Sequence, residues 1–180
     1  MIRLFVAIPI PEAIRLHLSM ICSGAPGAKW VAPENYHLSL RFIGEVDHGV
    51  ADDIDSALSE IQAPSFPLKI SGVGYFGKGD KARILWAGAA PQIHLDHLQA
   101  KVESALVRAG LPAEGRRFFP HVTLARLKRP DPARLDAYVG DHAGFQAMPF
   151  SVDRFVLYSS FLSQSGAIYT PEADYSLSHV

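Results

Sequence analysis

Residues 37–40 read His-Leu-Ser-Leu, and residues 121–124 read His-Val-Thr-Leu. The two stretches lie 84 residues apart (121 − 37), close to half of the 180-residue chain. Alternating polar and aliphatic residues are typical of a strand with one buried face, because successive side chains point to opposite faces. Each strand therefore presents an imidazole and a hydroxyl on one face. The repeat predicts two similar halves that each give one strand to a shared cleft.

Hydrophobic periodicity around these strands predicts an alternation of strands and helices. Apolar runs predict strands at 3–8, 38–43, 66–76, 84–87, 122–127, 150–161 and 168–177. Helical spacing predicts helices after Pro11 and at 52–61, 93–109 and 132–139. Paired strands in the middle and at the end favour an α+β fold with antiparallel sheets and helices outside. Because no long linker interrupts the chain, residues 1–180 are expected to form a single domain of two lobes.

Composition limits the function classes. The chain has 17 Lys and Arg against 18 Asp and Glu, a net charge of −1, which excludes a polyanion binder that works by bulk charge. A local basic site is still allowed. The single cysteine, Cys22, cannot form an internal disulfide and fits a reducing compartment. The apolar run 4–8 is too short for a signal peptide, and no stretch of about 18 apolar residues exists, so we expect a cytoplasmic protein without a membrane span.

The paired motifs suit phosphoryl chemistry. One imidazole can remove a proton from an attacking water while the other protonates the leaving oxygen, and in-line displacement needs them on opposite sides of the phosphorus. Hydroxyls and nearby cations, Arg126 above all, can hold the non-bridging oxygens. Arg126 lies five residues after His121 and therefore on the opposite strand face by simple alternation. A bulge or twist is needed to bring it to the cleft.

The other histidines fall on predicted helices, turns or the tail, and we interpret them as surface or structural residues: His17, His48, His94, His97, His142 and His179. His94 and His97 have the i, i+3 spacing of a possible metal pair on a helix. Further ligands are missing nearby, and a Cys-based zinc site needs more than the one cysteine. The sequence therefore predicts no metal site.

The flanks of the two motifs resemble the two-histidine phosphoesterase superfamily, and most closely its bacterial RNA 2',3'-cyclic phosphodiesterases, formerly named 2'-5' RNA ligases. The resemblance runs almost end to end. It covers residues 3–8, 30–40, 42–46, 85–88, 117–126, 155–160 and 166–169. Ser39 departs from the family, which usually has threonine there, but serine keeps the hydroxyl and loses only a methyl group.

The resemblance implies a bilobal, pseudo-symmetric α+β fold in which two antiparallel sheets line a central cleft. It also implies metal-independent opening of an RNA 2',3'-cyclic phosphate to a 2'-phosphomonoester, with no cofactor. By the same resemblance His37 is the proton donor to the leaving 3'-oxygen, and His121 is the proton acceptor that activates water. Ser39, Thr123 and Arg126 are implied as phosphate contacts. A pair of coupled imidazoles predicts a bell-shaped pH profile of turnover.

Substrate contacts beyond the phosphate are expected from side chains near the predicted cleft strands. Aromatic residues there either stack on a terminal base or belong to the core: Tyr36, Phe42, Trp86, Phe118, Phe119 and Tyr158. Tyr36, Phe42 and Phe119 are taken as substrate-binding candidates. Basic residues form either a rim along an RNA 3' end or a solvated surface: Arg41, Arg83, Arg116, Arg117, Lys128 and Arg129.

Three functions stay open from the sequence. Cyclic phosphodiesterase activity on RNA 3' ends or cyclic nucleotides comes first, and ADP-ribose cyclic phosphate is a further substrate within the superfamily. Ligation in the reverse direction, forming a 2'-5' linkage, uses the same residues. The third is a non-catalytic module that binds RNA ends, which has no need of both imidazoles. We expect a monomer.

Overall fold

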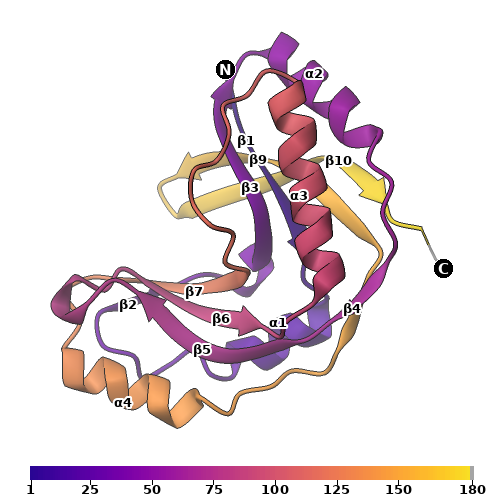
Figure 1. The fold of residues 1–180 in the computed structure, drawn as a ribbon. Helices are drawn as coiled ribbons and strands as arrows, with labels where there is room; N and C mark the ends of the chain where they lie inside the picture. The colour runs from indigo at the N-terminus through magenta and orange to yellow at the C-terminus, as the bar shows by residue number, and fades with distance from the viewer. Residues whose placement is uncertain (179–180) are drawn as a thin grey trace.

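The computed structural model describes residues 1–178 (Figure 1). Its strands are β1 (Ile2–Pro9), β2 (Ala28–Trp30), β3 (His37–Val46), β4 (Phe66–Leu68), β5 (Ile70–Phe76), β6 (Ile84–Ala89), β7 (His121–Leu127), β8 (Phe150–Val152), β9 (Arg154–Ser163) and β10 (Gly166–Ser176). Its helices are α1 (Glu12–Ser19), α2 (His48–Ser59), α3 (Ile93–Arg108) and α4 (Pro132–His142), with short 3-10 helices η1 (Pro33–Asn35) and η2 (Gly79–Lys81). The predicted α+β class is confirmed.

Eight of the strands form one antiparallel sheet. Seven follow the order β10-β9-β1-β3-β7-β6-β5, and β2 pairs with residues 125–127 of β7. The two histidine strands, β3 and β7, are neighbours in this order, but they pair through a single register position, Leu38 opposite Val122. The sheet is therefore two antiparallel halves joined at one point. In Figure 1, β1 and β3 run steeply while β5, β6 and β7 cross below them.

Each half of the sheet draws strands from both halves of the sequence. The His37 strand lies beside β1 and, through it, the C-terminal hairpin β9–β10. The His121 strand lies beside β6, which pairs with β5. The two halves of the sheet are thus interleaved along the chain, a connectivity that the sequence repeat by itself does not predict.

Helices cover the apolar side of the sheet. Helix α3 buries Leu95, Leu98 and Val102, and it packs against α2 and β3. Helix α4 buries Leu135 and Tyr138 in a second, smaller core with residues of β5, β6 and β7. Asp47 and Asp131 begin α2 and α4 by accepting hydrogen bonds from Val50 N and Arg134 N. Because the helices take the aliphatic face of β3 and β7, the polar face with its histidines stays accessible.

The main departures from prediction are at strand boundaries. The predicted strand 66–76 is two strands, and β4 leaves the main sheet to pair with β8. The predicted strand 150–161 likewise divides into β8 and β9. Strand β2 was not predicted, because three residues are too few to show a period of two. No helix within residues 1–178 is long and apolar enough to cross a membrane.

Candidate active site

The two histidine strands carry the same irregularity at the same position. On β3, Ser39 and Arg41 pair with consecutive residues of β1, so Leu40 is an extra residue. On β7, Thr123 and Ala125 pair with consecutive residues of β6, so Leu124 is an extra residue. Such a β-bulge shifts the alternation of side chains by one position. Leu40 and Leu124 are 84 residues apart and so repeat the spacing of the two histidines.

This bulge decides where Arg126 points. Leu124 and Ala125 are both buried, and the exposed Arg126 then falls on the same face as His121 and Thr123. The twofold repeat puts Phe42 at the matching place on β3, where it is also exposed after two buried residues. The condition that the sequence set for Arg126, a bulge between it and His121, is met.

The antiparallel register exchanges partners between the motifs. With Leu38 opposite Val122, His37 lies nearest Thr123, and Ser39 lies nearest His121. The hollows of the surface show the same arrangement. One, of about 360 Å³, is lined by His37, Thr123 and Arg126, among others. The other, of about 480 Å³, is lined by His121, Phe76 and Phe119, among others. Ser39 and Phe42 line both hollows, so the two adjoin.

Both imidazoles are held in the same way. Nδ1 of His37 lies 2.9 Å from the carbonyl oxygen of Asn35, and Nδ1 of His121 lies 2.7 Å from that of Phe119. A carbonyl only accepts, so Nδ1 carries the hydrogen in each ring. Nε2 is therefore the atom of each neutral imidazole that is able to accept a proton, and it is the atom that donates one from the charged form. Each ring is held by the backbone carbonyl two residues before it, so the two rings have matching orientations.

Burial lowers the pKa of both histidines. For His37, burial lowers the pKa below its ordinary value, the hydrogen bond to Asn35 opposes this, and the charge of His121 lowers the pKa further. For His121, burial again lowers the pKa, and the hydrogen bond to Phe119 opposes it. Neutral imidazoles are thus favoured in the folded protein. Either neutral ring is able to accept a proton at Nε2, and an anion bound between the two rings would raise the pKa of both.

These pKa shifts predict a pH dependence of stability. The ordinary histidine pKa is 6.5, and both folded values lie below it, so the unfolded chain binds more protons than the folded protein as pH falls through that range. The stability that these two groups contribute is therefore present above 6.5 and is lost as the pH falls below 6.5. Urea unfolding of a His37→Gln, His121→Gln double variant is expected to show a smaller loss of stability than the wild type when the pH is lowered from above 6.5 to below it. An equal loss in both proteins would contradict the assignment of this dependence to the two histidines.

Aromatic rings enclose each imidazole. The ring of Tyr169 meets His37 edge-on at 5.3 Å between centroids, and Phe5 lies at 4.8 Å. Phe76 meets His121 edge-on at 5.0 Å. The sequence did not indicate Tyr169, Phe5 or Phe76 as site residues. The one available signal for Tyr169 was the family-like stretch 166–169.

The predicted substrate aromatics divide between the site and the core. Phe42 and Phe119 line the hollow at His121, and each has at least half of its side chain exposed. Trp86 lies beneath Phe76 and Phe119 and across Gly74, where a Cβ would stand 2.5 Å from the indole. The prediction for Tyr36 is wrong. Tyr36 is 4% exposed, and its hydroxyl lies 3.0 Å from Cys22 Sγ in the core, because it points to the face opposite His37.

The basic residues are also divided. Arg116 and Arg117 line the hollow at His121. Arg41 also lines this hollow, but it is not part of an exposed basic rim, because its side chain is buried and its Nε lies 2.8 Å from Oε2 of Glu103 on α3. Its guanidinium also donates to the carbonyl oxygens of Phe42 and Pro112. Simple alternation would place Arg41 on the same face as His37. The bulge at Leu40 shifts it to the buried face.

Arg41 and Glu103 together fasten the loop that leads into β7. Arg41 donates to the Pro112 carbonyl, and Oε1 of Glu103 accepts a hydrogen bond of 2.7 Å from the backbone N–H of Glu114. Glu114 in turn accepts from Arg116. This loop continues through Phe119, whose carbonyl orients His121. The ion pair therefore reaches the site through the backbone of residues 112–119.

Breaking this pair is expected to destabilise the protein and loosen the loop. Arg41→Met leaves Glu103 without its partner, which costs about 3 kcal/mol, the lower end of the range for buried pairs, because Glu103 stays partly exposed. Urea unfolding measures this loss. An Arg41→Met, Glu103→Leu double variant is expected to recover part of it, since apolar replacement of a whole pair is often neutral. Equal stability of the single variant and the wild type would contradict the role given to the pair.

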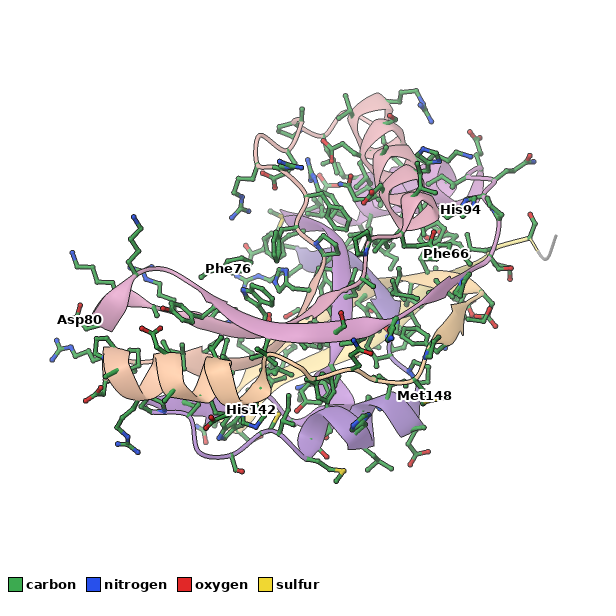
Figure 2. All side chains as sticks on the ribbon, turned by 60° about the horizontal axis from the view of Figure 1, so that its bottom comes forward. Phe66, Phe76, Asp80, His94, His142 and Met148 are labelled. Carbon is green, nitrogen blue, oxygen red and sulfur yellow. The ribbon has the colours of Figure 1, made fainter. Side chains whose placement is uncertain are left out.

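The other described histidines lie away from both hollows. In Figure 2, His94 on α3 and His142 on α4 are well separated from Phe76, and neither lines the hollows. His179 lies outside the described residues. Within residues 1–178, no three His, Cys, Asp or Glu side chains are grouped as a metal site would require.

Fold and site together define a class of α+β protein in which two histidine-bearing strands adjoin at the junction of a divided antiparallel sheet. The profile of the 2'-5' RNA ligase superfamily matches residues 9–160, and the chain therefore belongs to that superfamily. Among its relatives is the RNA 2',3'-cyclic phosphodiesterase of Thermotoga maritima, 34% identical over 173 residues, which are 93% of this chain and 91% of that protein. That of Bacillus subtilis is 31% identical over 166 residues, 89% of each chain.

Solved structures agree with this relationship. The crystal structure of a phosphoesterase superimposes with a TM-score of 0.81 at 27% identity, covering 98% of both chains. The crystal structure of Escherichia coli LigT in complex with 3'-AMP gives the same TM-score, identity and coverage.

Proposed function

We propose that this protein hydrolyses 2',3'-cyclic phosphate ends of RNA, or 2',3'-cyclic nucleotides, to 2'-phosphomonoesters without a metal ion. The observation that carries the proposal is the matched pair of imidazoles in two hollows that share Ser39. Each imidazole has Nδ1 on a backbone carbonyl, and neither Nε2 has a hydrogen-bond partner within residues 1–178. The names of the relatives, RNA 2',3'-cyclic phosphodiesterases, support the substrate class.

The roles given to the two histidines are those that the resemblance to the superfamily implies, with one histidine on each side of the phosphorus. Nε2 of His121 takes a proton from water as the water oxygen forms a bond to phosphorus. The bond from phosphorus to the 3'-oxygen breaks, and Nε2–H of His37 protonates that oxygen, leaving the phosphate on the 2'-oxygen. Ser39 and Thr123 donate hydrogen bonds to the non-bridging oxygens, and Arg126 balances their charge. The lowered pKa of His121 keeps it neutral for its task.

Ligation is a second candidate, because one observation favours it. The hollow at His121, on the side of the attacking group, has a volume of about 480 Å³ and exposes Phe42 and Phe119. A single water needs only about 30 Å³. The hollow therefore has room for a nucleoside 5'-hydroxyl in place of water, and the same acid and base would form a 2'-5' linkage.

The single cysteine, Cys22, supports a reducing and thus cytoplasmic location as part of the proposal. A single domain of two lobes, acting as a monomer, completes it. Both lobes contribute one histidine to the site, so neither is expected to act alone.

The decisive experiment incubates the purified protein and EDTA with an RNA that ends in a 2',3'-cyclic phosphate. The expected product is the 2'-phosphomonoester, identified by ³¹P NMR. A second arm adds an RNA with a 5'-hydroxyl and measures joined product. No opening of the cyclic phosphate, or opening only when a divalent metal ion is supplied, would overturn the proposal.

A further inference from the structure

A groove continues from the His37 hollow along the outside of the sheet. It has a volume of about 880 Å³ and runs between β2 with η1 on one side and the β9–β10 hairpin on the other. It shares Asn35, Arg126, Leu162, Ala167 and Tyr169 with the hollow that contains His37. None of these residues lines the hollow at His121. The groove is therefore an extension of one side of the site only.

Two cations stand side by side in this groove. Lys29 on β2 is the register partner of Arg126 on β7, so the two side chains project from the same face of the sheet. Both line the groove, and neither forms an ion pair within residues 1–178. Glu34 is the one acidic residue among the lining residues. Two cations on neighbouring strands are suited to bind two phosphates of a polynucleotide.

The opposite wall has apolar side chains that the fold leaves uncovered. Leu162 and Ile168 flank the turn of the β9–β10 hairpin, and more than half of each side chain is exposed. A hydrogen bond of 3.0 Å from Asn35 Nδ2 to the Ala167 carbonyl ties the hairpin to η1 and sets the width of the groove. Apolar side chains facing cations match the two sides of a nucleic acid strand, bases and backbone.

The chemistry of the site chooses between the two directions for the strand. This step rests on the proposed function, in which His37 protonates the leaving 3'-oxygen. That oxygen belongs to the ribose of the terminal nucleotide, so the ribose and the RNA chain attached to its 5' side lie on the side of His37. The side of His121 is left to the attacking group. The groove adjoins the hollow of His37 through the residues that the two share.

We propose that this groove binds the RNA chain upstream of the cyclic phosphate, with Arg126 on the cyclic phosphate, Lys29 on the next phosphate upstream and the β9–β10 hairpin contacting bases. The preferred substrate class is then a polynucleotide end and not a mononucleotide. Arg116 and Arg117, the basic residues that line the His121 hollow, do not bind the upstream RNA.

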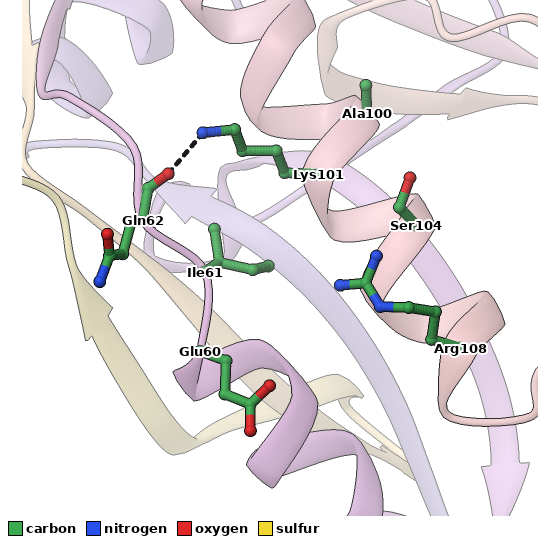
Figure 3. A pocket seen from close by; sticks show the side chains of 7 residues that line it. All are labelled: Glu60, Ile61, Gln62, Ala100, Lys101, Ser104 and Arg108. Atoms are coloured by element: carbon green, nitrogen blue, oxygen red, sulfur yellow. Dashed lines mark hydrogen bonds between the residues drawn. The ribbon is translucent and has the colours of Figure 1, made fainter.

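The test compares a tetranucleotide ending in a 2',3'-cyclic phosphate with 2',3'-cyclic AMP. Lys29→Ala is expected to lower the ratio of kcat/KM for the tetranucleotide to that for cyclic AMP about fivefold, and to reduce the salt slope of tetranucleotide binding by about 0.7. The matched control is Arg108→Ala, in a separate pocket between α2 and α3 that shares no residue with the site (Figure 3). Arg108→Ala is expected to change neither quantity.

A second readout keeps the groove independent of turnover. Fluorescence anisotropy measures binding of a tetranucleotide with a 2'-phosphate end, so it reports on the groove even if the protein opens no cyclic phosphate. Weaker binding by Lys29→Ala but not by Arg108→Ala supports the groove. The proposal would be overturned if Lys29→Ala bound the tetranucleotide with unchanged affinity, or if Arg117→Ala lost more affinity than Lys29→Ala. Either result would place the RNA outside this groove. Failure of the proposed function would instead appear as lack of wild-type turnover on both substrates.

Discussion

Replacing either histidine of the pair with alanine is expected to lower kcat at least about 100-fold, the lower end of what a general acid or base contributes. The two variants are distinguished by their pH profiles. A bell-shaped profile has an acid limb from protonation of the base and an alkaline limb from loss of the proton from the acid. His121→Ala is therefore expected to lose the acid limb, and His37→Ala the alkaline limb. Initial rates on a 2',3'-cyclic phosphate between pH 5 and 9 measure both effects.

The control for these variants is His97→Ala on α3, which lies outside both hollows and is expected to keep wild-type activity. Circular dichroism shows whether the variants fold. If a folded His37→Ala or His121→Ala variant kept wild-type turnover, the role given to that residue would be wrong. If the two variants lost the opposite limbs, the assignment of acid and base would be reversed, and with it the expected direction of the RNA strand.

Removing the guanidinium of Arg126 is expected to lower kcat about 100-fold, since loss of one group that stabilises transition-state charge has an effect of this order. Arg126 is exposed and lies on the face of β7 that carries Thr123, so Arg126→Ala leaves the core untouched. Its free energy of unfolding is expected to stay within about 0.5 kcal/mol of the wild type. Single-turnover rates and urea unfolding measure the two quantities.

Arg126→Lys separates charge from geometry. A lysine keeps the charge but cannot form two parallel hydrogen bonds to phosphate oxygens, so we expect activity between that of Arg126→Ala and the wild type. Full activity in Arg126→Ala would show that the bulge at Leu124 brings Arg126 to the surface without a part in the reaction.

Local sequence patterns predict many of the strands and helices of this protein. Alternation at 37–40 and 121–124 predicted two strands, each with a histidine and a hydroxyl on one face, and the structure has both strands as predicted. Helical spacing located α3 to within one residue, because its sixteen residues hold several turns of a regular apolar stripe. Strand β2 was not predicted, since three residues carry too little pattern, and β4 was predicted only as the start of one longer strand with β5.

Tyr36 and Arg41 show how local reasoning fails near a site. Both neighbour the His37 motif in sequence. Tyr36 was expected to bind substrate, and Arg41 was expected either on a basic rim or on a solvated surface. Alternation already turns Tyr36 away from the face of His37, and the bulge at Leu40 turns Arg41 inward to Glu103, 62 residues away. Aromatic and basic character suits a core ring and a buried ion pair as well as it suits RNA.

The sequence by itself determined which chemical groups this protein has available. They are two imidazoles and two hydroxyls at matched spacings, with each pair on one face of a strand, and one arginine. The tertiary structure decided how these groups combine. A single pair, Leu38 with Val122, sets the antiparallel register that gives each histidine the hydroxyl of the other motif. Two bulges, at Leu40 and Leu124, decide that the Arg126 side chain is exposed beside Thr123, whereas the Arg41 side chain is buried against Glu103. Register and bulges depend on the partner strand, which lies far away in the sequence, and a local pattern has no means of recording them.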